Sequence, residues 1–119
     1  MSQFEQAKDN FLQQLSRDDF QFEATLAFID QYYHFTPSAF NNGEVSNSIE
    51  QNQGSCKVFA LAHLLELTQQ QTLSCFGQHY RDVLATPKVD NHHNLRRILK
   101  DGLKGIRFER FPLEQKADS

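Results

Sequence analysis

The residues best placed to do chemistry are Gly54, Ser55 and Cys56, where a polar loop runs into an apolar segment with helical character. The first backbone N–H groups of a helix have no partner within it and the helix dipole is positive there, so a thiolate at this point would be stabilised. Cys56 is therefore the candidate nucleophile. The competing interpretation, which we favour, is that Ser55 caps the helix and Cys56 packs as a small apolar residue.

A nucleophilic cysteine also needs a base and a donor for an oxyanion. The candidates are His92 or His79 as the base, Asn94 or Asn91 as the group that orients it, and Gln51 or Asn52 as the oxyanion donor. The order of Gln51 and Cys56 is similar to that of papain-like enzymes, but those enzymes carry their base much farther downstream on a sheet. A cysteine-dependent hydrolase or transferase that uses Cys56 and a histidine base is thus the alternative function.

The long polar segment from residue 36 to residue 53 supports a different function. It is rich in Asn, Ser and Gly, and Asn42-Gly43 is a typical turn pair. Such a long loop is often functional, although its short side chains could also bond only to their own backbone. We expect it to fold against the start of the apolar helix and to leave a cleft for a small polar ligand. The residues expected to bind that ligand are Asn42, Gln51, Asn52, Ser55, His79, Asn94 and Arg96.

Composition and motif spacing limit the possible partners, cellular locations and cofactors. The net charge of −3 argues against a nucleic-acid partner. No apolar run is long enough to cross a bilayer, and the first residues do not resemble a Sec signal. No C-x-x-C or H-E-x-x-H spacing is present, so we expect neither a metal nor a cofactor. Two cysteines without a secretion signal favour reduced thiols in a cytoplasm. The expected partner is an unknown small polar ligand or a protein, and the oligomeric state stays open.

These candidate residues must be positioned by helices. Apolar spacings predict five helices, over about residues 4–15, 22–33, 56–67, 69–84 and 92–101. Asp18 or Asp19 is expected to cap the second, a capping box of Thr68 and Gln71 the fourth, and Asp90 or Asn91 the fifth, which Gly102 ends. The third helix is apolar nearly all round, which indicates that it is central and buried.

The C-terminal part predicts a small β element. Residues 105–109 alternate like a strand, with a partner expected near residues 33–36 or else in the long loop, and the chain after Pro112 is expected to fray. The fold class is therefore α+β and predominantly α-helical, with about five helices around a central apolar helix and a small β element near the C-terminus. The expected core residues are Phe11, Phe22, Leu26, Ile29, Phe59, Leu61, Leu64, Phe76, Tyr80 and Ile98.

Four ordered blocks also resemble a known family. They read FEATLAFIDQYYHFTPSAFNNG from residue 22, NQGSCKVF from residue 52, FGQHYRDVLATP from residue 76 and HHNLR from residue 92. Together they resemble the HopJ type III effector family over nearly the whole chain. The resemblance implies one small, mostly helical bacterial domain over residues 1–119, in the cytoplasm or exported by a type III-like system. It implies no particular activity.

Overall fold

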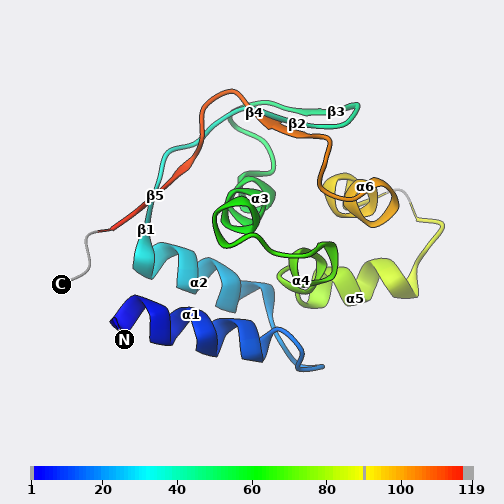
Figure 1. Cartoon of the computed structure of the whole chain (residues 1–119). Helices are drawn as coiled ribbons and strands as arrows, with labels where there is room; N and C mark the ends of the chain where they lie inside the picture. The colour runs from blue at the N-terminus through cyan, green and yellow to red at the C-terminus, as the bar shows by residue number, and fades with distance from the viewer. Residues whose placement is uncertain (1, 90, 117–119) are drawn as a thin grey trace.

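The computed structural model describes residues 2–89 and 91–116, and one helix lies at its centre with the other elements arranged around it (Figure 1). The central helix is α3, Gln53–Leu65. The surrounding helices are α1 (Gln3–Gln14), α2 (Phe22–Tyr32), α4 (Gln69–Ser74), α5 (Gln78–Ala85) and α6 (His93–Asp101). In this view one group of strands lies above α3 and a second pair of strands lies to its left, while α1 and α2 lie below it. The predicted fold class, α+β with a predominance of helix, is confirmed.

Helix α3 is central because apolar residues cover most of its circumference. Its side chains from Val58 to Ala62 are all buried. The helix begins three residues before the predicted start at Cys56, since Asn52 rather than Ser55 is its N-cap residue. Asn52 adopts a left-handed conformation with φ of 52°, and the Cys56 N–H donates to its carbonyl at 3.0 Å. The expected cap by Ser55 is therefore wrong, and Ser55 lies in the first turn.

Helix α2 packs on α1 through aromatic side chains. Phe11 and Phe28 stack with ring centroids 4.6 Å apart. The predicted cap of α2 by Asp18 or Asp19 is wrong, because Gln21 is the N-cap residue and does not cap with its side chain. The Phe22 N–H instead donates to the Gln78 side-chain oxygen at 2.7 Å. A residue 56 positions away in sequence thus satisfies the start of α2.

The predicted fourth helix is interrupted at Gly77, so the described residues form six helices rather than five. Gly77 has a φ of 56°, and a Cβ atom there would collide with the backbone nitrogen of Phe22. The chain can therefore pass this close to α2 only with glycine. The predicted capping box before α4 is confirmed, with both hydrogen bonds between Thr68 and Gln71 formed at 2.9 and 3.0 Å.

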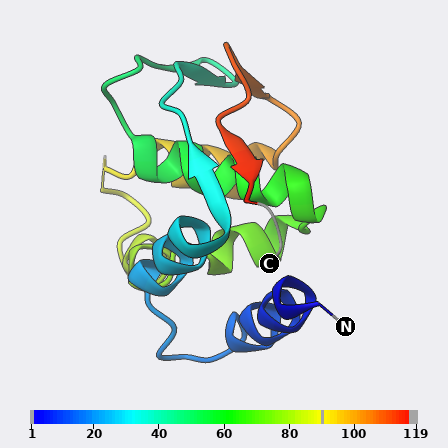
Figure 2. The same cartoon turned by 90° about the vertical axis from the view of Figure 1, so that its left-hand side faces the viewer.

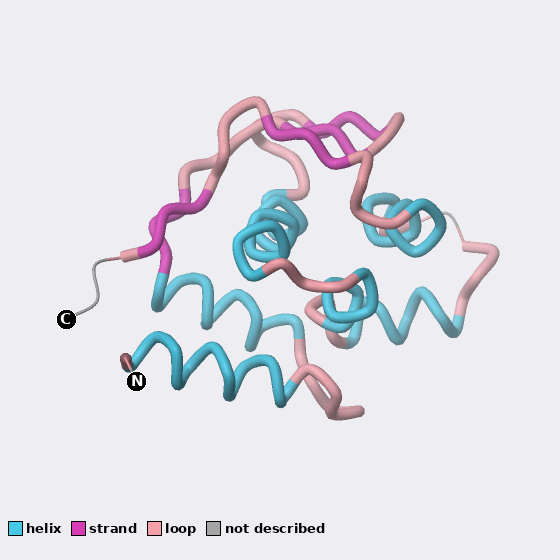
Figure 3. Tube along the Cα trace, in the orientation of Figure 1, coloured by secondary structure: helices cyan, strands magenta, loops and turns pink. Residues whose placement is uncertain are grey.

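Two small antiparallel sheets cover one side of α3 (Figures 2 and 3). One has the order β3-β2-β4, from strands Val45–Asn47, Phe40–Asn42 and Ile106–Phe108. The predicted C-terminal strand thus pairs with the long loop, the second of the two expected partners. The other sheet pairs β1 (Tyr33–Phe35) with β5 (Leu113–Gln115).

The expectation that the chain frays after Pro112 is wrong for the residues that the structure describes. The Pro112 carbonyl accepts from the Thr36 N–H at 2.8 Å, and the Lys116 N–H donates to the Tyr32 carbonyl at 2.9 Å. The polar side chains of this tail face solvent while its backbone pairs with β1. The polar sequence after Pro112 therefore gave no indication of strand β5.

Most of the predicted core is confirmed. Phe11, Ile29, Phe59, Leu61, Phe76 and Ile98 are buried, and Phe22, Leu26 and Tyr80 are half-buried. The prediction that Leu64 belongs to the core is wrong, because this residue is 42% exposed. Gly102 ends α6 as expected, with a φ of 76°. The N-cap residue of α6 is His92 and not Asn91, while Asp90, the other expected cap, lies outside the described residues.

Candidate functional site

A cleft of about 190 Å³ lies where the first turns of α3 and α6 meet α5. In Figure 2 the start of α3 and the yellow chain that leads into α6 lie on the same side of the molecule. Five of the predicted site residues line this cleft: Asn52, Ser55, His79, His92 and Asn94. The other lining residues are Phe22, Gly54, Phe76, His93 and Leu95. Segments that are distant in sequence thus converge here.

Two imidazole rings lie next to each other in the lining of this cleft. The ring centroids of His79 and His92 are 5.3 Å apart. The ring of Phe22 lies edge-on to His79 at 5.1 Å and stacks on Phe76 at 5.8 Å, which gives His79 an apolar support. On the other side, the Nε2 atom of His92 lies 3.4 Å from a carboxylate oxygen of Asp82. The two histidines therefore have different surroundings within one cleft.

The two helices that border the cleft begin in the same unusual way. Their N-cap residues, Asn52 and His92, both adopt left-handed backbone conformations, with φ of 52° and 50°. Neither residue caps its helix with its side chain. The cleft is lined by Gly54 and Ser55 from one first turn and by Asn94 and Leu95 from the other. The N–H groups that a side-chain cap would bind at each helix start therefore belong to residues that line the cleft.

Asparagine amides hold these two helix starts together. The side-chain oxygen of Asn47 accepts from the amide of Asn52 at 2.7 Å and from the amide of Asn94 at 2.8 Å. The Asn47 amide in turn donates to the Asn94 side-chain oxygen at 3.2 Å and to the Phe40 carbonyl at 3.4 Å. Asn47 and Asn94 are both buried. A single side chain from the β2–β3 hairpin therefore joins both walls of the cleft.

Three predicted ligand-binding residues serve the framework around the cleft. Asn42 is buried behind Asn94 and donates to its backbone carbonyl at 2.9 Å. The Gln51 side-chain oxygen accepts from the Ser48 N–H at 3.2 Å, which closes a turn before α3. Arg96 donates to the carbonyl of Asn91 at 2.6 Å and to its side-chain oxygen at 2.7 Å. These bonds order the chain on either side of the cleft.

Cys56, the predicted nucleophile, is fully buried beside the cleft and does not line it. Its Sγ atom lies 3.8 Å from the Ser38 carbonyl oxygen. Burial raises the pKa of the Cys56 thiol to about 11, against a smaller opposing effect of that carbonyl contact. An activated cysteine needs a shift in the other direction. The geometry therefore supports packing rather than nucleophilic chemistry at this position.

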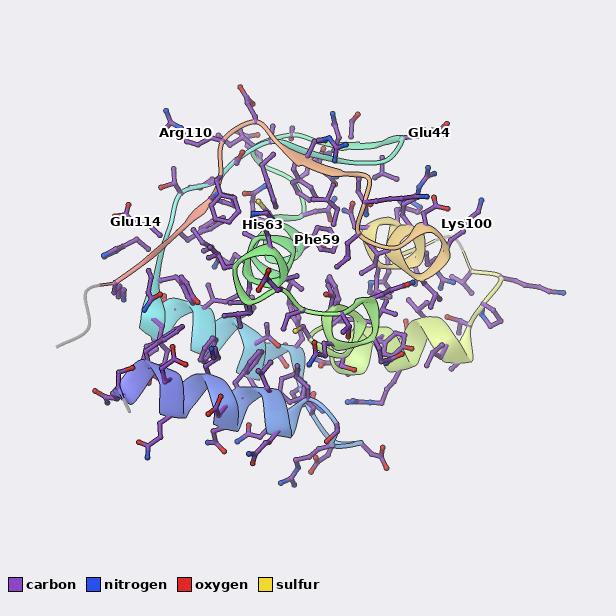
Figure 4. The ribbon with its side chains drawn as sticks, viewed as in Figure 1. Glu44, Phe59, His63, Lys100, Arg110 and Glu114 are labelled. Atoms are coloured by element: carbon purple, nitrogen blue, oxygen red, sulfur yellow. The ribbon has the colours of Figure 1, made fainter. Side chains whose placement is uncertain are left out.

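Sequence reasoning did not single out Asn47 among the amides of the polar loop, and it did not predict a second hollow. Asn47 stands in a run of Asn and Ser residues without any spacing that distinguishes it. The second hollow, of about 540 Å³, lies between α3 and β4, and Phe59, Leu67, Ile106, Phe108 and Phe111 contribute most of its apolar lining. Figure 4 labels Phe59 and His63, two of the three residues of α3 that line this hollow. None of the predicted site residues lies in it.

A cluster of metal-ligating side chains and a membrane-spanning helix are both absent from residues 2–89 and 91–116. No three or more His, Cys, Asp or Glu residues are grouped so that they could hold a metal ion. No helix in these ranges has the length and apolar character to span a membrane.

Comparisons with known proteins agree with this architecture. The family model for the HopJ type III effector protein matches residues 8–113. A crystal structure described as the unknown function protein VPA0580 is 43% identical in sequence, with a TM-score of 0.86 over 91% of this chain and 92% of that one. A search of curated proteins gave no match. Because the family model covers most of the chain, this protein belongs to the HopJ type III effector protein family.

Proposed function

We propose that this HopJ family protein is a binding module that holds a small polar ligand in the cleft between the starts of α3 and α6. The observation that carries this proposal is the convergence of Asn52, Ser55, His79, His92 and Asn94, from three separate segments, on one cleft. A few convergent polar groups beside apolar walls are the usual composition of a ligand site. Here Phe22, Phe76 and Leu95 supply the apolar part.

The size and rigidity of the cleft indicate what kind of ligand would fit. Its volume of about 190 Å³ is smaller than the roughly 300–1,000 Å³ of pockets for drug-sized molecules. The ligand should therefore be compact, with few non-hydrogen atoms. The buried Asn47 and Asn94 amides fix the walls before any ligand arrives, so little conformational entropy would be lost on binding.

The family name supports a second part of the proposal, that the protein is exported from a bacterium by a type III system. Before export it would reside in the bacterial cytoplasm. A secretion assay that compares a normal strain with one lacking the secretion apparatus tests this part. Appearance of the protein in the medium of the normal strain alone is the expected result, and equal amounts from both strains would contradict it.

The binding proposal is tested by screening small polar compounds, both neutral and charged, by saturation-transfer NMR. Ser55→Trp would fill the cleft, whereas Ser48→Trp places the same side chain at an exposed loop position and serves as the matched control. We expect one or more compounds to bind the wild type and the control but not Ser55→Trp. If no compound binds, or if binding survives Ser55→Trp, the proposal is wrong.

A further inference from the structure

We propose that the ligand of this cleft is a small oxyanion, or the oxyanion group of a small molecule, and that protonation of His79 and His92 controls its affinity. This inference rests on the proposed function and specifies the class of ligand and its regulation. It starts from the two imidazole rings, which face one cleft with centroids 5.3 Å apart. Histidine is the side chain that ordinarily changes charge between pH 5 and 8.

Protonation would change what this pair can bind. A neutral imidazole offers one N–H donor and one acceptor, whereas an imidazolium offers two donors and a positive charge. Two imidazolium groups at this separation repel each other, and an anion that contacts both would offset that repulsion. The doubly protonated cleft should therefore bind an oxyanion more tightly than the neutral one.

The charged groups around the pair come from each neighbouring helix. Asp82 of α5 approaches His92, with 3.4 Å between its Oδ2 atom and Nε2. Glu23 of α2 lies near His79, and its pKa is lowered mainly by a hydrogen bond from Gln78 and slightly by the charge of His79. His93 of α6 adds a third imidazole to the lining. The Asp82 side chain is about half exposed, so water can solvate its carboxylate when an anion takes its place beside His92.

The backbone around the cleft also favours an anion. The first turns of α3 and α6 carry no acidic residue, and neither N-cap side chain occupies their N–H groups. The positive dipole of a helix start stabilises a bound oxyanion. The histidines and the two helix starts thus favour the same sign of ligand charge in one cleft.

Sulfate is the best probe because its charge is constant between pH 5.5 and pH 8. At fixed ionic strength, NMR titrations should show sulfate binding about tenfold more tightly at pH 5.5 than at pH 8, a change of about 1.4 kcal/mol. Sulfate should also raise the titration midpoints of the His79 and His92 rings but not that of His34, which is exposed on β1. This ring measurement uses the unmodified chain and does not depend on the folding of any variant.

Variants then separate the two histidines from the general charge of the protein. His79→Gln together with His92→Asn should remove most of the pH dependence and leave only the contribution of His93. Asparagine suits the left-handed backbone at position 92. The matched control His34→Gln should retain it. Asp82→Asn should tighten sulfate binding, since it removes the carboxylate that competes for His92.

The outcomes distinguish this inference from the proposed function. If other polar compounds bind the cleft while sulfate does not, or if sulfate binds equally at both pH values, the oxyanion inference is wrong and the binding function stands. If the double variant keeps the pH dependence, the histidines do not control it and the inference is also wrong. If neither sulfate nor any polar compound binds, both proposals fail.

Discussion

The replacement of Asn47 is the most informative perturbation of this fold, because one buried amide joins the hairpin to both helix starts. Asn47→Ala removes the acceptor for Asn52 and Asn94 as well as the donor to Asn94 and Phe40. Asn52 is exposed and can bond to water instead, but Asn94 is only 4% exposed. The main cost therefore comes from the Asn94 amide, which is left without an acceptor.

The magnitude follows from these contacts. An orphaned buried donor costs about 1–3 kcal/mol, and the loss of the remaining bonds adds about 1 kcal/mol. The expected decrease in the free energy of unfolding is therefore about 2–4 kcal/mol, a large part of the roughly 5–15 kcal/mol typical of a domain. With a urea dependence of about 2 kcal/mol per M, the middle of the usual range, the unfolding midpoint should fall by about 1–2 M.

Urea unfolding followed by circular dichroism measures this change directly, since the chain has no Trp for fluorescence. The matched control is Ser46→Ala, at an exposed position next to Asn47, which should change the stability by less than about 0.5 kcal/mol. If Asn47→Ala costs no more than this control, the amide network does not hold the two helix starts and our account of the site is wrong.

Asn47→Asp tests the same network through its charge. The aspartate has the same shape, but it presents an oxygen to the Asn94 side-chain oxygen and the Phe40 carbonyl. These acceptors and burial should raise the pKa of the new carboxyl above its unfolded value. The loss of stability should therefore be small below the unfolded pKa and grow as the pH rises through it. A loss that does not depend on pH between 3 and 7 would contradict this.

Three further predictions concern the framework. Gly77→Ala should lower the free energy of unfolding by more than about 2 kcal/mol, since its positive φ and the backbone of Phe22 leave no room for a Cβ atom; chemical denaturation checks this, and a loss below about 0.5 kcal/mol would be inconsistent with it. Cys56 should resist iodoacetamide at pH 8 in the native protein and react after unfolding, because it is buried and its pKa is raised to about 11; rapid native alkylation, mapped by mass spectrometry, would revive the thiol chemistry. Burial also raises the pKa of Cys75 to about 12, so the stabilising effect of both neutral thiols should be complete below their unfolded pKa and should decline as the pH rises above about 9. Cys56→Ala should therefore show a shallower decline of the urea midpoint between pH 9 and pH 10.5 than the wild type. An equally steep decline in both proteins would refute this link between thiol ionisation and stability.

Local patterns predicted the helices well because helix periodicity and capping act over a few residues. The capping box of Thr68 and Gln71 and the end of α6 at Gly102 formed as expected. The break at Gly77 could not be predicted, since it depends on the approach of Phe22 from a distant segment. The start of α2 likewise depends on Gln78, which no local pattern could identify.

The same difference between local patterns and tertiary contacts explains which residues of the candidate site could be predicted. His79, His92 and Asn52 were selected mainly by residue type, and the fold brings them to one cleft. Arg96 was equally suitable by type but is used to hold Asn91. Asn47 was not singled out from the other loop amides because its role arises only from tertiary contacts with Asn52 and Asn94. Residue chemistry therefore predicted candidates, while tertiary contacts decided which of them share a cleft.

A backbone amide shift map of the whole chain, recorded during titration with a small polar compound, tests the central claim most directly. We predict that the largest shifts cluster at residues 52–55, 79 and 92–95, around the cleft. Shifts confined to residues 59–67 and 103–111 would place binding in the apolar hollow between α3 and β4 and would contradict our account.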